Sequence, residues 1–270
     1  MSNYVEIQSL QRAFDLLDII GGSSSPLALK EISVQAALPR SSTYRFLRNL
    51  EQRGYIRCDT NGKYHLGLKF LLLQQQGDQD FELKKLARPF LERLREATGE
   101  TVHLGVLFQN RVLYVDSVES PHLIRMVAQI GSTIGVYCTA LGKALLMNLD
   151  NEEVLKILET ETMVQRTEST LLTPDAYLAD IERTRLWGYG MDAQESSEDS
   201  RCISAPILDN QGRAIGAISI SGPSSRFGKE EIENVAVPAL LAATSELSDL
   251  LGGGNQSVSD RKARKERTKR

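Results

Sequence analysis

Apolar residues recur at every third or fourth position through three short segments at the start of the chain. Residues 7–20, 29–37 and 38–50 each carry such a stripe, which predicts three amphipathic helices. The stripe of the first helix holds Leu10, Phe14, Leu17 and Ile20. Glycine and serine at residues 21–26 end that helix, and Leu38-Pro39 makes a tight turn into the third. This order of helices indicates a helix-turn-helix.

The period of the pattern shortens directly after the third helix. Residues 55–58 and 63–66 read as two strands, and Asn61-Gly62 between them is a strong hairpin signal. Three helices followed by a hairpin within about sixty residues predict a winged helix-turn-helix. A further short helix is expected at residues 67–76.

The rest of the chain alternates hairpins with helices. We expect a helix at 81–98, where Leu83, Leu86, Phe90 and Leu94 share one side and a partner subunit could cover that stripe. Strands are predicted at 101–108, 111–117, 124–128, 202–208 and 214–221, and helices at 139–149, 152–158, 174–187 and 229–250. Hairpins mixed with helices favour an α+β domain with an antiparallel sheet over a parallel Rossmann sheet. The expected divisions are 1–76 (winged helix-turn-helix), 77–98 (linker helix), 99–251 (second domain) and 252–270 (disordered basic tail).

Composition adds a charge asymmetry to this picture. The net charge of −3 combines +3 over residues 1–76 and +5 over residues 259–270 with a strongly acidic remainder. A basic head on an acidic body is typical of a protein that contacts a polyanion at one end. The absence of any run of about 18 apolar residues and of a signal-peptide pattern favours a cytoplasmic protein with no membrane partner.

Cysteine and histidine usage argues against a disulfide-stabilised protein and against a zinc protein. Cys58, Cys138 and Cys202 are odd in number and far apart, which fits free thiols in a reducing compartment. The three histidines stand at no metal-ligand spacing from them, so we expect neither a zinc site nor another cofactor. No phosphate-binding loop, dinucleotide fingerprint or hydrolase motif is present.

The third helix carries the predicted DNA contacts. Short hydroxyls and arginines at a helix start suit phosphates and base edges in a major groove, whereas a solvated face with a chance basic bias is the alternative. The helix-turn-helix context and the basic head decide for DNA. The predicted contacts, including Lys63 at the wing with Arg57 beside it, are Arg40, Ser41, Ser42, Tyr44, Arg45, Arg48 and Lys63.

Three groups in the second domain are candidates for ligand chemistry. Thr139 begins a helix whose free N–H groups could bind a carboxylate or serve only as an ordinary capped end. Ser219 and Ser221 alternate with isoleucines, so both hydroxyls share a face that is either solvated or lines a cavity. Asp192 and Cys202 bracket a polar loop at 193–201. No histidine lies near Cys202 in sequence, which favours a small buried side chain or a ligand contact over a nucleophile.

Several motifs in order resemble the IclR family of bacterial transcriptional regulators across residues 7–251. In the head they are Leu38-Pro39-Arg40-Ser41-Ser42-Thr43-Tyr44-Arg45-Phe46-Leu47, Gly54-Tyr55 and Tyr64-His65-Leu66-Gly67. In the second domain they are Thr139-Ala140-Leu141-Gly142-Lys143, Arg201-Cys202-Ile203-Ser204-Ala205-Pro206-Ile207 and Gly216-Ala217-Ile218-Ser219-Ile220-Ser221-Gly222-Pro223. The segment after Asp192 departs from the family pattern, which usually has consecutive acidic residues and a glycine there.

The resemblance implies a winged helix-turn-helix, a linker helix and a GAF-like effector-binding domain, assembled as homodimers and commonly dimers of dimers. It implies a ligand-responsive regulator of a catabolic operon, favouring a repressor over an activator, whose partners are double-stranded operator DNA and a small carboxylate effector such as a keto, sugar or aromatic acid. A ligand-independent architectural DNA binder and a Cys202-dependent enzyme are the rival hypotheses. The family's effector positions fall on Leu123, Met126, Ala140, Leu141, Asp192, Cys202, Ser219 and Ser221.

Overall fold

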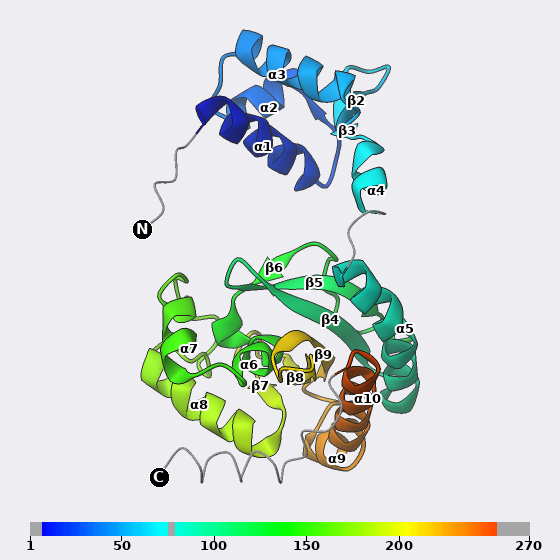
Figure 1. The fold of residues 1–270 in the computed structure, drawn as a ribbon, viewed down its shortest axis with the longest axis vertical. Coiled ribbons are helices and arrows are strands. Elements are labelled where there is room, and N and C mark those ends of the chain that lie inside the picture. Colours follow the sequence, from blue (N-terminus) through cyan, green and yellow to red (C-terminus); the bar gives the residue numbers. More distant parts are fainter. Residues whose placement is uncertain (1–6, 75–78, 253–270) are drawn as a thin grey trace. The chain divides into compact units, whose positions relative to one another are not determined.

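The computed structural model describes residues 7–74 and 79–252, which form two compact units divided in the chain between Phe81 and Glu82. The N-terminal unit combines short helices with a small sheet, and the C-terminal unit has helices on both faces of a larger sheet (Figure 1). The predicted basic tail beyond residue 252 lies outside the described residues.

The N-terminal unit is a winged helix-turn-helix, as predicted. Its helices are α1 (Gln8–Gly21), α2 (Leu29–Gln35), α3 (Arg40–Gln52) and α4 (Lys69–Gln74). Its strands are β1 (Leu27–Ala28), β2 (Ile56–Cys58) and β3 (Lys63–Leu66), antiparallel in the order β1-β3-β2. Leu16, Ile32, Leu47 and Ile56 are fully buried in one apolar cluster that joins α1, α2 and α3 to the hairpin.

The stripe predicted for α1 was only partly right. Leu16 and Ile20 are buried, whereas Leu10 and Phe14 are 51% and 56% exposed. The reason is that the apolar residues of α1 span a wide arc, and one small apolar cluster covers only the part centred on Leu16.

Two turns set the shape of this unit. Ala37, between α2 and α3, has a φ of 50°, a left-handed conformation that is unusual for a residue with a Cβ. At the wing, Asp59 Oδ1 accepts from the backbone N–H groups of Asn61 and Lys63, and Gly62 takes a φ of 74°. The Asn-Gly signal in the sequence therefore identified the hairpin correctly.

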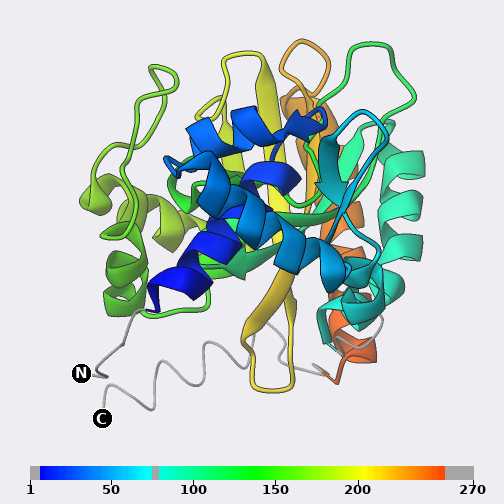
Figure 2. The ribbon, with the colours of Figure 1, turned by 90° about the horizontal axis from the view of Figure 1, so that it is seen from above.

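The C-terminal unit is built on an antiparallel sheet in the order β6-β5-β4-β9-β8-β7. The strands are β4 (Thr101–Phe108), β5 (Arg111–Val118), β6 (Thr133–Ile134), β7 (Gly190–Ala193), β8 (Ser200–Leu208) and β9 (Ala214–Pro223). The long β8–β9 hairpin, yellow in Figure 2, crosses the whole unit. This is the expected α+β architecture with an antiparallel sheet.

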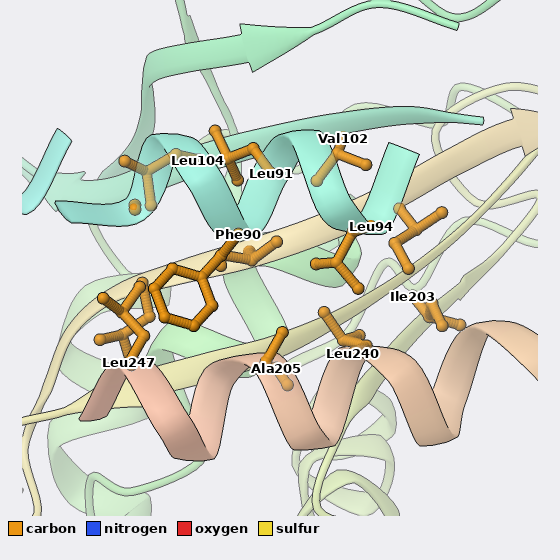
Figure 3. Packing of buried hydrophobic residues seen from close by; sticks show 14 of the residues in the cluster. Phe90, Leu91, Leu94, Val102, Leu104, Ile203, Ala205, Leu240 and Leu247 are labelled. Atoms are coloured by element: carbon orange, nitrogen blue, oxygen red, sulfur yellow. The ribbon is translucent and has the colours of Figure 1, made fainter. Parts of the chain in front are cut away.

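Helices α5 (Gln79–Thr98) and α10 (Val237–Leu250) cover one face of the sheet. Phe90, Leu91 and Leu94 of α5 meet Leu240 and Leu247 of α10 over the apolar side chains of the strands (Figure 3). The stripe of the predicted linker helix therefore packs against the sheet and α10 of its own chain, and not on the partner subunit that the sequence offered as a possible cover. Before α10, the predicted single helix is divided into α9 (Lys229–Glu231) and a π-helical segment, Ile232–Ala236.

Helices α6 (Ala140–Leu146), α7 (Asn151–Leu158) and α8 (Pro174–Trp187) gather on the other face. Glycines let α6 approach the strands closely. A Cβ at Gly190 would lie 2.8 Å from the carbonyl oxygen of Ala140, and one at Gly105 would lie 3.1 Å from Leu141. None of the described helices is long and apolar enough to cross a membrane.

The strand predicted at residues 124–128 was wrong. Tyr114, on the β5 edge that such a strand would need, bonds instead to residues 131–132: its N–H donates to Ser132 O and its carbonyl accepts from Gly131 N. Only the two-residue strand β6 follows there, and Ile124 is 73% exposed. Strand β7 was missed because its sequence, Gly-Met-Asp-Ala, has no β-branched or aromatic residue.

Candidate DNA-binding and effector-binding sites

The outer face of α3 is the candidate DNA-binding surface. Thr43, Leu47 and Leu50 are buried, and Thr43 Oγ1 donates to the carbonyl of Pro39 at the start of the helix. Because these three residues point into the core of the unit, the opposite face of α3 is exposed. Of the predicted contact residues on α3, Ser42 is half-buried and the exposed ones are Arg40, Ser41, Tyr44, Arg45 and Arg48.

The arginines of this face differ in their partners. Arg48 Nη1 lies 2.9 Å from Glu51 Oε2, so its charge is partly compensated on the helix. Among the described residues, no carboxylate lies within 4.0 Å of the Arg40 or Arg45 guanidinium. Free guanidinium groups beside short hydroxyls can bind phosphate oxygens and guanine edges.

The wing is attached to α3 by a carboxylate. Glu51 Oε1 accepts from the backbone N–H of Cys58 at 3.2 Å, which joins β2 to the end of α3. At the tip, the His65 imidazole and two backbone N–H groups hold the pKa of the Asp59 carboxyl at about 2. Lys63 is exposed beside this turn, so the structure presents its ammonium at the wing.

The candidate effector site lies on the α6 face of the C-terminal sheet. Asp192 on β7 pairs with Cys202 on β8, and Cys202 pairs with Ser221 on β9. Directly paired residues share a face, so three predicted residues form one row across the sheet. Ser219 stands two positions from Ser221 on the same face and is 2% exposed. The two serines are therefore buried rather than solvated.

Two residues of this face were missed in the sequence. His103 on β4 pairs with Ser219 on one side and with Ser117 on β5 on the other. Tyr114 of β5 contacts the His103 ring edge-on, with 5.4 Å between centroids. The signal was available: Thr101, His103 and Gly105 alternate with Val102, Leu104 and Val106. The strand itself is predicted correctly at 101–108, but the sequence did not single out its polar side chains as part of a site.

Asp192 is nearly fully buried and organises the loop that follows it. Its Oδ1 accepts from the Glu195 N–H at 2.6 Å, and its Oδ2 accepts from Ser196 Oγ at 2.5 Å. Burial raises the pKa of the Asp192 carboxyl, and these hydrogen bonds act in the opposite direction. A carboxylate held in this way can accept from a ligand hydroxyl only beside existing bonds.

Lys143 of α6 is a further residue whose role in the structure could not be predicted from the sequence. Its side chain is 0% exposed, and Nζ lies 2.6 Å from Asp180 Oδ2, Glu195 Oε1 and the Met191 carbonyl. Burial raises the pKa of the Glu195 carboxyl, which the Lys143 ammonium opposes. The ion cluster joins α6, α8 and the loop after Asp192.

The first turn of α6 confirms the predicted cap. Thr139 Oγ1 accepts from the Gly142 N–H at 3.1 Å, and Ala140 and Leu141 are buried against the sheet. Within the part of the chain that the structure describes, no acceptor is bonded to the N–H of Ala140 or Leu141. Neither N–H group is therefore committed to another part of the described chain.

The remaining predicted effector residues lie in two different environments. Leu123 is 94% exposed and Met126 is half-buried, both on the segment between β5 and β6. Cys202 is a free thiol, and burial raises its pKa well above the ordinary value, which opposes thiolate formation. Across residues 7–74 and 79–252, no cluster of three potential metal ligands occurs.

A winged helix-turn-helix with an exposed basic helix, followed by a separate unit with a buried polar cluster, defines a DNA-binding transcriptional regulator. Residues 9–60 match the model of the IclR helix-turn-helix domain, and residues 78–249 match that of the bacterial transcriptional regulator IclR C-terminal domain. The chain belongs to the IclR family. The members of this family are transcriptional regulators and not enzymes, which excludes the Cys202-dependent enzyme.

Individual relatives agree with this assignment. The transcriptional repressor IclR of Escherichia coli is 34% identical, with 88% of each chain covered, and the regulator KdgR of the same species is 32% identical over 91% of this chain and 93% of its own. The crystal structure of Thermotoga maritima IclR is 28% identical and matches 92% of this chain and all of its own with a TM-score of 0.74. An IclR homologue from Microbacterium hydrocarbonoxydans, complexed with 4-hydroxybenzoate, shares the fold at 22% identity and a TM-score of 0.81, with 90% and 98% covered.

Proposed function

We propose that this protein is a cytoplasmic repressor of a catabolic operon that senses a small organic acid and binds its operator as a homodimer, assembled further as a dimer of dimers. The burial of Ser219, Ser221 and Asp192 on one sheet face, beside unbonded N–H groups of α6, carries the effector half of the proposal. Burying a polar group costs free energy unless a partner satisfies it. Asp192 already has partners in Glu195 and Ser196, so the argument rests on the two serine hydroxyls and the α6 N–H groups, for which a polar ligand is a partner. The relatives named as repressors support the sign of regulation.

In this proposal the effector carboxylate accepts from the N–H groups of Ala140 and Leu141. Its hydroxyl or keto oxygens meet Ser219, Ser221 and Asp192, with Cys202 beside them, and Leu123 and Met126 of the β5–β6 segment supply the apolar wall. The 4-hydroxybenzoate of the Microbacterium homologue supports the choice of a small carboxylate. Binding must favour one of two protein arrangements, because a ligand with equal affinity for both changes nothing.

For DNA, we propose that Arg40, Ser41, Ser42, Tyr44, Arg45 and Arg48 enter a major groove and that Lys63 contacts an adjacent phosphate. The exposed, uncompensated guanidinium groups of Arg40 and Arg45 support this assignment. A base-reading arginine and a phosphate-binding arginine differ in what their loss does: the former changes sequence preference, the latter lowers affinity for all sequences.

The experiment combines calorimetry with a gel shift. Purified protein selects its operator from random duplex DNA, and pyruvate, gluconate and 4-hydroxybenzoate are titrated against protein and complex. An acid that binds should lose about tenfold in affinity with Ser221→Ala and none with Ser225→Ala, which is exposed. Arg45→Ala should weaken operator binding by about 1–3 kcal/mol, whereas Arg213→Ala in the C-terminal unit is the charge-matched control.

The alternatives give different results in the same assays. Operator binding that no organic acid changes would identify a ligand-independent DNA binder. Release of the operator by the acid supports a repressor, while tighter operator binding with transcription switched on in a reporter strain indicates an activator. Acid binding that Ser221→Ala and Asp192→Ala both leave unchanged would place the effector elsewhere.

A further inference from the structure

His103 stands in the middle of the polar face rather than at its margin. It is 3% exposed on β4 and lies between Ser219 and Ser117 in one row of the sheet. The neighbouring position on the same face, Gly105, lies under Leu141 of α6. His103 is therefore placed between a serine and a helix turn that both belong to the proposed effector site.

One ring nitrogen of His103 is hydrogen-bonded within the described chain and the other is not. Nδ1 lies 3.0 Å from Ser117 Oγ, and among the described residues nothing is hydrogen-bonded to Nε2. Burial lowers the pKa of His103 to about 4, so the ring is neutral at neutral pH. When the Ser117 hydroxyl donates to Nδ1, the ring proton resides on Nε2, and the ring offers one N–H donor.

We propose that His103 is an effector-binding residue whose Nε2–H donates to a carboxylate or keto oxygen of the acid, beside the Ser219 hydroxyl. This inference rests on the proposed effector function. A ligand oxygen at Nε2 selects the tautomer with the Nε2 proton, and the Ser117 hydroxyl stabilises it. The ring adds a directional donor to a sheet face that otherwise supplies hydroxyls, a thiol and a carboxylate, so it selects for acids with an acceptor oxygen at that point.

The same contact is connected to α5. Ser117 bonds to His103 through its side chain and accepts from Arg88 Nη1 of α5 through its carbonyl at 3.2 Å. Arg88 Nη1 also lies 3.2 Å from Oδ1 of the adjacent, buried Asp116. Ser117 thus touches the ring on one face of the sheet and the helix on the other, so its removal should disturb the orientation of the ring.

The test compares His103→Phe, which keeps a ring of similar size without donors, with His103→Gln, which keeps an N–H donor. The acid that binds the wild-type full chain in calorimetry should lose about tenfold or more in affinity with His103→Phe and recover part of it with His103→Gln. Ser117→Ala should cause a smaller loss than His103→Phe. The matched control is His65→Phe, in the wing, which should leave acid affinity unchanged.

The outcomes separate this inference from the function on which it rests. If pyruvate, gluconate and 4-hydroxybenzoate all fail to bind the wild type, the proposed acid effector fails for these probes, and His103 with it. If an acid binds and His103→Phe binds it within about twofold of the wild type, only the inference is overturned. Should both variants unfold, the ¹⁵N resonance of His103 Nε2 in the wild type decides: an unchanged shift on saturation with the acid also overturns it.

Discussion

Removing the buried Lys143 charge should destabilise the C-terminal unit by much more than removing a surface lysine. In Lys143→Met the apolar chain still fills most of the space, but Asp180 and Glu195 lose the ammonium that lies 2.6 Å from each. Breaking a buried ion pair by deleting one partner costs about 3–5 kcal/mol, because an uncompensated charge stays behind. A domain is typically stable by only about 5–15 kcal/mol, so the variant should unfold at clearly lower denaturant concentrations.

The loss should also depend on pH in a defined direction. Burial already raises the pKa of the Glu195 carboxyl while Lys143 opposes the rise, so the variant holds that pKa further above the unfolded value. A raised folded-state pKa stabilises the fold below the unfolded pKa, and this contribution is lost as pH rises through the folded pKa. The deficit should therefore be largest near pH 8, smaller near pH 5, and reduced by adding Glu195→Gln.

Urea unfolding followed by tryptophan fluorescence measures this unit specifically, since Trp187 is the only tryptophan of the chain. The matched control is Lys156→Met, because Lys156 and Glu152 form an ion pair at 2.7 Å with both side chains mostly exposed. Such a pair contributes about 0–1 kcal/mol. The reasoning would be refuted by a Lys143→Met deficit no larger than that of the control, or by a deficit that does not change between the two pH values.

Two further predictions concern a close approach and a buried base. Gly67→Ala should destabilise the N-terminal unit by roughly 1–3 kcal/mol, because the new Cβ would lie 2.1 Å from the Gly54 carbonyl oxygen. Hydrogen exchange of the N-terminal unit measures this loss. The control is Gly21→Ala, whose Cβ has its nearest contact at 3.4 Å and which should leave exchange unaffected. Burial lowers the pKa of His103 from 6.5 to about 4, so the imidazole of the unfolded chain is protonated at a higher pH than that of the folded chain. As the pH drops from 6.5 to 4, the wild type should therefore lose up to about 3 kcal/mol of unfolding free energy relative to His103→Gln. Equal pH dependence in the two proteins would contradict this assignment.

The N-terminal unit could be predicted almost completely because its signals are local. Helical spacing in α3 gave the buried Thr43, Leu47 and Leu50, and Asn61-Gly62 gave the wing. The exposure of Leu10 and Phe14 could not be predicted, since it depends on how much of the α1 arc the small cluster covers. Periodicity identifies an apolar face, but packing decides which part of that face is buried.

In the C-terminal unit, the alternation of polar and apolar residues predicts which side chains share a face of a strand, but it does not predict which strands pair. Alternation placed Ser219 and Ser221 on one face correctly, because the side-chain period of a strand is two. The juxtaposition of Asp192 with Cys202 depends on β7, which joins β8 across a loop and lacks β-forming residues. Lys143 follows a glycine in a helix and carries no sequence signal of burial; its environment comes from Asp180 and Glu195, both remote in the chain.

The two faces of the C-terminal sheet are used differently, and this asymmetry makes a ligand-responsive unit physically reasonable. On one face, Ile218 and Ile220 pack with α5 in a continuous apolar core, which fixes that helix. On the other, the strand β9 changes within four residues from Ala217, which packs beneath α6, to Ser221. Along their strands, His103, Ser219 and Ser221 each stand next to an apolar residue of the α5 face. A ligand that moves β9 or β5 relative to its neighbours acts on both faces at once, because a strand cannot shift one set of side chains without the other.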